Sequence, residues 1–109
     1  MVRPMVIKGV LKEELENSLR MKKRFEQELA KLPKGSLVKR RIKGHEYYYL
    51  VYREDGAFKA DYRGKIVSSK ELRKYEVAKQ RRAEYRRSLS QLKKQIRFLR
   101  GVLRGKEAI

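Results

Sequence analysis

The stretch from Ser36 to Arg63, SLVKRRIKGHEYYYLVYREDGAFKADYR, constrains the fold of this chain more than any other. It is rich in tyrosine, which favours β-strands, and it contains the glycine turns Lys43-Gly44 and Asp55-Gly56. Two-residue turns of this kind join antiparallel strands, because glycine readily adopts a positive φ. We therefore predict a three-stranded antiparallel meander over residues 36–63, with strands at 37–42, 46–53 and 57–63.

The turn length fixes which side chains share a face of this sheet. With two residues in each turn, Val38 pairs with Tyr49 and Val51 pairs with Ala60, and side chains alternate between the faces. One face then collects Val38, Ile42, Tyr47, Tyr49, Val51, Phe58, Ala60 and Tyr62, with Arg40 at its edge. The other collects Lys39, Arg41, Tyr48, Leu50, Tyr52, Lys59, Asp61 and Arg63. We predict that the first face packs in the core and that the second, basic and aromatic face meets a partner.

The segment before the sheet has the pattern of an amphipathic helix over residues 10–32. Its apolar residues recur mainly at spacings of three and four, at Leu11, Leu15, Leu19, Phe25, Leu29 and Leu32. Pro33 and Gly35 end it, because proline lacks an amide donor and disfavours helix in the residue before it. Residues 1–9, with Pro4 and Gly9, are expected to form an irregular arm.

A long basic helix is predicted over residues 69–104, with Ser69 as the N-cap candidate. Its seam is coiled-coil-like, at Tyr75, Ala78, Arg82, Tyr85, Leu89, Leu92, Ile96, Leu99 and Leu103. At 1.5 Å per residue this helix is roughly 50 Å long, so its seam needs a partner helix. The first helix in antiparallel arrangement can cover part of the seam, and a second copy of the chain can cover the rest. We predict an α+β fold in a single domain, residues 1–109.

The charge balance points to a polyanionic partner. Lysine and arginine number 31 against 13 acids, which gives a net charge of +18. A chain this basic repels itself unless a polyanion neutralises it, and nucleic acid, DNA before RNA, is the expected partner. In the sheet the candidate binding residues are Lys39, Arg41, Tyr48, Tyr52, Lys59 and Arg63. In the long helix they are Arg81, Arg86, Lys93 and Arg97.

Two other classes of function remain open from the sequence. One is a protein-interaction module, in which the helical seam pairs with itself as a homodimer or with an acidic protein, as in a toxin-antitoxin or phage-defence pair. The other is a small metal-dependent nuclease using Glu54 or Asp61. With no cysteine and a single histidine, His45, the chain lacks a nucleophile-base pair, so we expect no enzyme, metal or cofactor. No apolar run approaches the roughly 20 residues of a membrane span, and a cytoplasmic protein is expected.

Two resemblances add to these expectations. The segment LPKGSLVKRRIKGHEYYYLVYREDGAFKADYRG with the basic helix after it resembles a family of short, basic, uncharacterised prokaryotic proteins. More loosely, three strands followed by a helix are similar to the arm-binding domain of tyrosine-recombinase integrases. That resemblance implies a sheet that places one face in the DNA major groove. It would put Lys39, Arg41, Tyr48 and Tyr52 at groove-facing positions.

Overall fold

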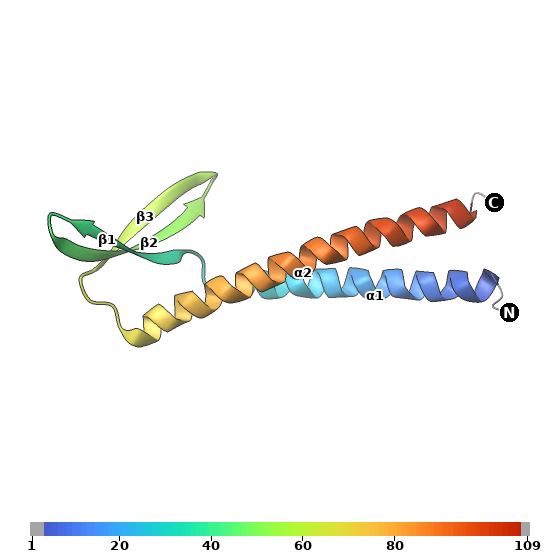
Figure 1. The fold of residues 1–109 in the computed structure, drawn as a ribbon, viewed down its shortest axis with the longest axis horizontal. Coiled ribbons are helices and arrows are strands. Elements are labelled where there is room, and N and C mark those ends of the chain that lie inside the picture. Colours follow the sequence, from blue (N-terminus) through green and yellow to red (C-terminus); the bar gives the residue numbers. More distant parts are fainter. Residues whose placement is uncertain (1–3, 108–109) are drawn as a thin grey trace. The chain divides into compact units, whose positions relative to one another are not determined.

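The computed structural model describes residues 4–107 of the chain, and the side chains of residues 7–105. In chain order, a helix, a three-stranded sheet and a second, longer helix follow one another (Figure 1), so the predicted α+β architecture is confirmed. The elements are α1 (Pro4–Lys31), β1 (Ser36–Ile42), β2 (His45–Glu54), β3 (Ala57–Gly64) and α2 (Ser69–Glu107). The chain divides into two compact units. Of the described residues, the helical unit comprises 4–30 and 84–107, and the sheet unit comprises 31–83.

In the helical unit, α1 and the second half of α2 run antiparallel, side by side (Figure 1). The rings of Phe25 and Tyr85 lie 5.7 Å apart, and Ser18 is hydrogen-bonded to Gln95. The residue number rises on one helix as it falls on the other, which is the antiparallel arrangement that the seam predicted. The described apolar residues buried here all belong to that seam: Leu89, Leu92, Ile96, Leu99 and Leu103.

The buried stripe of α1 differs by one residue from the prediction. Ser18 is only 1% exposed, whereas Leu19 is 36% exposed. The sequence assigned Leu19 to the stripe because it is apolar. Alternating steps of three and four from Leu15, however, lead to Ser18 and then to the half-buried Lys22. Ser18 is tolerated there because its hydroxyl accepts a hydrogen bond of 2.9 Å from Nε2 of Gln95.

α1 also begins earlier than predicted. It starts at Pro4 rather than at Val10, so the irregular arm expected over residues 1–9 is helical from Pro4 on. Residues 1–3 lie outside the described residues. Proline is well suited to the first turn of a helix, because the amide that it lacks would have no intrahelical partner there. The helix ends at Lys31, before Pro33.

The sheet has the order β1-β2-β3 and the predicted register. Both turns contain two residues with positive φ: 51° and 80° at Lys43 and Gly44, and 52° and 78° at Asp55 and Gly56. These are the backbone angles of the two-residue turns that match the twist of paired strands. The pairs Val38 with Tyr49 and Val51 with Ala60 are therefore confirmed.

One irregularity interrupts the register at the end of β3. Tyr49 pairs with Tyr62, but Tyr48 pairs with Gly64, so Arg63 is an extra residue without a paired partner in the ladder. Gly64 has a φ of 106°, which glycine adopts without the penalty that a side chain incurs.

The predicted assignment of the two sheet faces is wrong. Phe58 and Tyr62, which were expected in the core, are 76% and 59% exposed. Leu50, on the face that was expected to meet a partner, is 6% exposed and is the buried apolar residue of the described sheet. The linker before β1 contributes to this burial: a Cβ built on Gly35 would lie 3.0 Å from Cδ1 of Leu50. Both faces carry aromatic side chains, so the hydrophobic pattern alone does not select the covered face.

α2 is capped by Ser68, one residue before the predicted Ser69. Oγ of Ser68 accepts a hydrogen bond of 3.2 Å from the amide of Glu71, and its carbonyl accepts one of 3.0 Å from the amide of Leu72. These are the two bonds of an N-cap residue, because its hydroxyl satisfies a first-turn amide and its carbonyl begins the helical ladder.

Candidate nucleic-acid interface

The exposed side of the sheet carries a cluster of aromatic rings. The centroid of the Tyr62 ring lies 5.6 Å from that of Tyr49 and 6.1 Å from that of Tyr47. These distances are typical of interacting aromatic pairs. Phe58 lies on the same face, opposite Arg53. We call this surface the aromatic face; its residues are Ser36, Val38, Arg40, Ile42, His45, Tyr47, Tyr49, Val51, Arg53, Phe58, Ala60 and Tyr62.

Three cations lie over rings of the aromatic face. Cζ of Arg53 is 5.2 Å from the centroid of Phe58, and Cζ of Arg40 is 5.8 Å from that of Tyr49. Nζ of Lys65, just after β3, is 5.7 Å from the centroid of Tyr47. A cation within about 6 Å of a ring is attracted to the negative face of its π-system. The aromatic face therefore holds positive charge close to exposed rings.

No acidic residue of the three strands lies on the aromatic face. Pairing places Glu46 beside Arg41, Asp61 beside Leu50 and Glu54 beside Ala57, all on the opposite side. We call that opposite side the mixed-charge face; it includes Leu37, Lys39, Arg41, Glu46, Tyr48, Leu50, Tyr52, Glu54, Lys59 and Asp61. The alternation of the strands thus separates an acid-free surface from one on which charges of both signs meet.

Most of the predicted sheet residues are on the mixed-charge face and already have partners within the chain. Nζ of Lys39 lies 2.9 Å from Oε2 of Glu46, and Nζ of Lys59 lies 3.5 Å from Oε2 of Glu54. Hydrogen bonding to the Glu46 carboxylate, reinforced by its charge, raises the pKa of Lys39 above its usual value. A cation paired in this way must exchange its carboxylate for a phosphate before it can contribute to binding.

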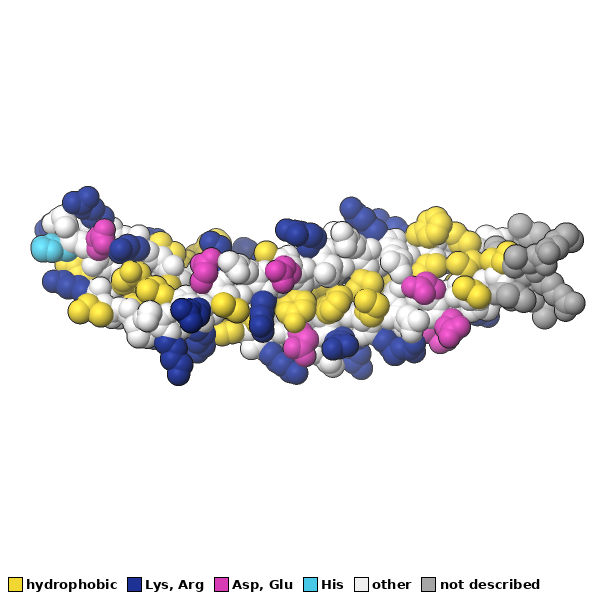
Figure 2. All heavy atoms as spheres, turned by 60° about the horizontal axis from the view of Figure 1, so that its bottom comes forward, with side chains coloured by type: hydrophobic (Ala, Val, Ile, Leu, Met, Phe, Trp, Pro, Cys, Tyr) yellow, Lys and Arg dark blue, Asp and Glu magenta, His cyan; other side chains and the backbone are white. Residues whose placement is uncertain are grey.

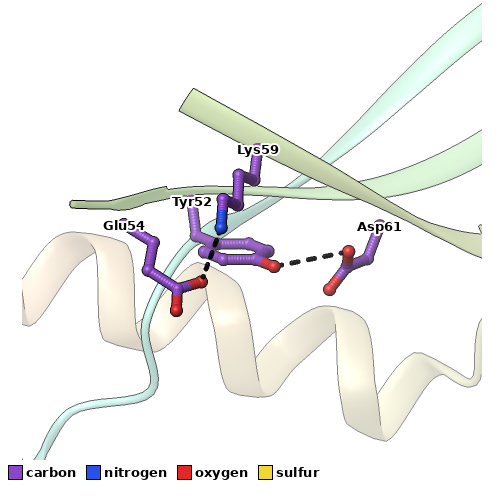
Figure 3. Close-up of polar contacts among 4 residues, drawn as sticks. All are labelled: Tyr52, Glu54, Lys59 and Asp61. Carbon is purple, nitrogen blue, oxygen red and sulfur yellow. Dashed lines mark hydrogen bonds and ion pairs between the residues drawn. The ribbon is translucent and has the colours of Figure 1, made fainter. Parts of the chain in front are cut away.

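Of the two predicted tyrosines of this face, Tyr52 is also hydrogen-bonded within the chain. The hydroxyl of Tyr52 donates a hydrogen bond of 3.4 Å to Oδ1 of Asp61, next to the Lys59–Glu54 pair (Figure 3). The pKa of Tyr52 is raised above its usual value. The larger cause is the partial burial of its ring, and the next is the negative charge of Asp61. The Tyr48 ring lies under Nζ of Lys39 at 5.6 Å.

Of the other predicted residues, Arg41 and Arg63 are exposed, and the helical ones fall in different units. Arg81 belongs to the sheet unit, and Arg86, Lys93 and Arg97 belong to the helical unit. Lys93 and Arg97 line one groove together. On the face drawn in Figure 2, Lys and Arg side chains are more widespread than Asp and Glu.

Sequence reasoning missed Arg40, Arg53, Phe58, Tyr62 and Lys65 as site residues. One signal could have indicated them, namely the distribution of acids. In the predicted register, the alternation of side chains along the strands places all three acids of the strands on one face. The opposite face is therefore free of negative charge.

No family model, curated protein or solved structure matches this chain. Within residues 4–107, no helix is both long enough and apolar enough to cross a membrane. Among the same described residues, no group of three or more His, Asp or Glu side chains is placed to hold a metal ion. His45 begins β2, and its ring lies 6.4 Å from that of Tyr47.

Proposed function

We propose that this protein binds nucleic acid, and that unpaired bases stack on the aromatic face of its sheet. The observation that carries the proposal is the exposed, acid-free cluster of rings with cations at their faces. Phe58 is 76% exposed and Tyr62 is 59% exposed on the same face, and exposed apolar side chains that gather on one surface mark interaction sites.

Unpaired bases fit this surface better than a closed duplex does. Every base has a π-face, and stacking of one base on an aromatic side chain contributes about 1–3 kcal/mol. Bases within a duplex are stacked on each other, so rings on a flat sheet can reach only bases that are free of pairing. Arg40 and Arg53 add guanidinium groups that can bind phosphates or stack on bases.

The net charge of +18 supports the same proposal through the phosphate backbone. Binding to phosphates releases condensed counterions, so affinity falls as salt rises. With about six phosphate contacts on a single strand, the slope of log K against log salt is expected to be about −4.

The test is a salt-titrated binding assay with an unstructured single strand, a duplex of the same sequence and a structured RNA. Two neighbouring residues of β1 provide a matched pair of variants: Arg40→Ala on the aromatic face and Arg41→Ala on the mixed-charge face. Both residues are exposed arginines, so each variant loses the same charge. We expect Arg40→Ala and Phe58→Ala each to weaken single-strand binding by about tenfold, consistent with stacking energies of about 1–3 kcal/mol. Arg41→Ala should change it by less than about threefold.

Three results would contradict the proposal. The first is no binding of any nucleic acid at low salt. The second is an equal loss of affinity in Arg40→Ala and Arg41→Ala, which would mean that diffuse charge alone attracts the ligand. The third is duplex binding that is tighter than single-strand binding and unaffected by Phe58→Ala.

A second candidate function is a protein-interaction module. Phe98 of α2 is 67% exposed and Val10 of α1 is 59% exposed, so the helical unit presents apolar side chains beyond its seam. A second copy in a coiled-coil-like pairing, or an acidic protein, could cover them. Light scattering at high protein concentration tests pairing with a second copy, and a purely monomeric protein would argue against it. Copurification with an acidic protein, and no retention of nucleic acid, would favour the second form.

A further inference from the structure

A groove of about 550 Å³ runs along the helical unit, between α1 and α2. Its apolar lining comes from Leu19 and from Ile96, which is 5% exposed. Five cations line the rest: Lys22 of α1 and Lys93, Arg97, Arg100 and Arg104 of α2. No acidic residue lines it. A cationic groove with an apolar lining favours an anion more strongly than a flat basic surface does, because the apolar atoms reduce solvent screening.

The α2 cations form a single stripe. Lys93, Arg97, Arg100 and Arg104 follow one another at steps of four, three and four residues, which is the repeat of one helix face. At 1.5 Å per residue the stripe is about 16 Å long. A single phosphate group cannot contact all four side chains over this length. The complementary ligand is therefore an extended chain with several negative charges.

The groove cations have little compensation from the acids whose side chains the structure describes. Nζ of Lys22, the α1 cation, lies 3.5 Å from Oε1 of Glu26, in a solvent-accessible pair of the kind that contributes little to stability. Among residues 7–105, whose side chains the structure describes, the four cations of the stripe form no ion pair with an acid. Their mutual repulsion persists until an anion binds.

We propose that this groove binds the phosphate chain of a nucleic acid, independently of its bases. The proposal rests on the proposed function and extends it: the aromatic face contacts bases, whereas the groove contacts only the backbone. Three of the four α2 cations are arginines, whose planar guanidinium groups match phosphate oxygens with two parallel hydrogen bonds.

Gly101 provides a way to close the groove without removing charge. It is one of the lining residues, and a Cβ built on it would meet no other atom within 4 Å. A larger side chain at this position therefore enters open space rather than the packed helix interface. Replacing glycine inside a helix also favours the helical state by up to about 1 kcal/mol. Gly101→Leu should thus fill the groove in a folded protein.

The experiment measures binding of long-chain inorganic polyphosphate to the full chain, because this probe has phosphates but no bases. The double variant Arg97→Gln/Arg100→Gln is compared with Arg87→Gln/Lys94→Gln, which also removes two positive charges, from exposed positions of the same helix outside the groove. We expect the groove variant to bind polyphosphate about tenfold more weakly and the control about twofold more weakly, because arginines that converge on one groove bind the same phosphate chain directly. Gly101→Leu should also weaken binding at least about fivefold, while circular dichroism confirms its helical content.

Equal effects of the two double variants, or unchanged binding in Gly101→Leu, would overturn the groove site. So would polyglutamate that binds as tightly as polyphosphate and with the same dependence on Arg97 and Arg100, because the groove would then fit an acidic protein. Phe58→Ala separates the two proposals, because Phe58 carries no charge and polyphosphate has no base to stack on its ring. If the groove is a phosphate site, this variant binds polyphosphate normally, whether or not it still binds the single-stranded oligonucleotide. A parallel weakening of polyphosphate binding in Phe58→Ala would contradict an independent groove.

Discussion

Arg82 of α2 donates a hydrogen bond of 2.7 Å from Nη2 to the carbonyl oxygen of Pro33, 49 residues earlier in the chain. The same nitrogen lies 3.5 Å from the carbonyl oxygen of Gly35. Both residues belong to the linker between α1 and β1, and Arg82 is half-buried. Arg82 is a charged residue in an otherwise apolar seam. It donates hydrogen bonds to backbone carbonyl groups of the linker, which lie outside the helices and strands. The contact fixes the linker against α2 within the sheet unit.

Replacing Arg82 with alanine should destabilise the sheet unit by about 1.5–3 kcal/mol, because a charge-assisted hydrogen bond is removed and a part-buried carbonyl is left unpaired. Urea unfolding measures the change. Arg81→Ala is the control, since Arg81 is exposed and the same charge is removed. It should change the free energy of unfolding by less than about 0.5 kcal/mol. Equal effects of the two variants would show that the hydrogen bond does not stabilise the fold.

Gly35→Ala should be more destabilising than Gly44→Ala. Both glycines have positive φ, 93° and 80°, so alanine incurs about 1–2 kcal/mol of backbone strain at either position. At Gly35 the new Cβ would also lie 2.8 Å from the carbonyl oxygen of Val51, whereas at Gly44 no atom lies within 4 Å. The clash should add about 1–3 kcal/mol. Thermal or urea unfolding of both variants checks the difference, and equal stabilities would argue against close packing of the linker on β2.

The contact between Ser18 and Gln95 should appear as a coupling energy in the helical unit. A double-mutant cycle with Ser18→Ala and Gln95→Ala should give about 0.5–1.5 kcal/mol, the usual net value of a hydrogen bond. Gln95→Ala alone leaves the hydroxyl of the buried Ser18 without this donor. The cycle is measured by urea unfolding. Additive effects of the two substitutions would mean that the bond is not formed in solution.

The stability of the sheet unit should depend on the ionisation of Tyr52. Burial and then Asp61 raise the pKa of this tyrosine from its ordinary value of 10.0. The unfolded chain therefore loses the proton first, and stability that is present below about pH 10 should fall as the pH rises through the raised pKa. Tyr52→Phe should remove this part of the pH dependence, measured by urea unfolding between about pH 8 and pH 11.

Asp61→Asn separates the two causes of this shift. It should lower the pKa of Tyr52 but not return it to the ordinary value, because burial is the larger cause. An NMR titration of ring-labelled tyrosine measures the pKa directly. A pKa of Tyr52 that does not change in Asp61→Asn would contradict the interaction seen in Figure 3.

The sheet was predictable in detail because its information is local. Gly44 and Gly56 readily adopt the positive φ values that two-residue turns require. The length of each turn then determines which residues pair along the strands. The seam of α2 was predictable for a similar reason, since a helical repeat places Leu89, Leu92 and Ile96 on one side. The bulge at Arg63 was not predicted, because no residue pattern distinguished it from a continuous strand.

The candidate site was predicted only in part. The sequence indicated a basic and aromatic sheet, and it sorted the side chains into the two observed faces except at Arg63, which lies in the bulge. It assigned the wrong face to the core, because it counted apolar residues and gave Leu50 less weight than Tyr47, Tyr49 and Tyr62. Lys93 and Arg97 were predicted as binding residues, but the groove that they share with Lys22 of α1 depends on a contact between distant segments.

The elements, the register of the sheet, the seam of α2 and the excess of positive charge were predictable from the amino-acid sequence. Each of these follows from interactions between residues close in the chain, or from composition alone. Which face of the sheet is covered and which stays exposed depends instead on tertiary contacts. One of them is the approach of the linker at Gly35 to Leu50, a contact between separate segments that local periodicity does not encode. That contact leaves Phe58 and Tyr62 exposed on the opposite face.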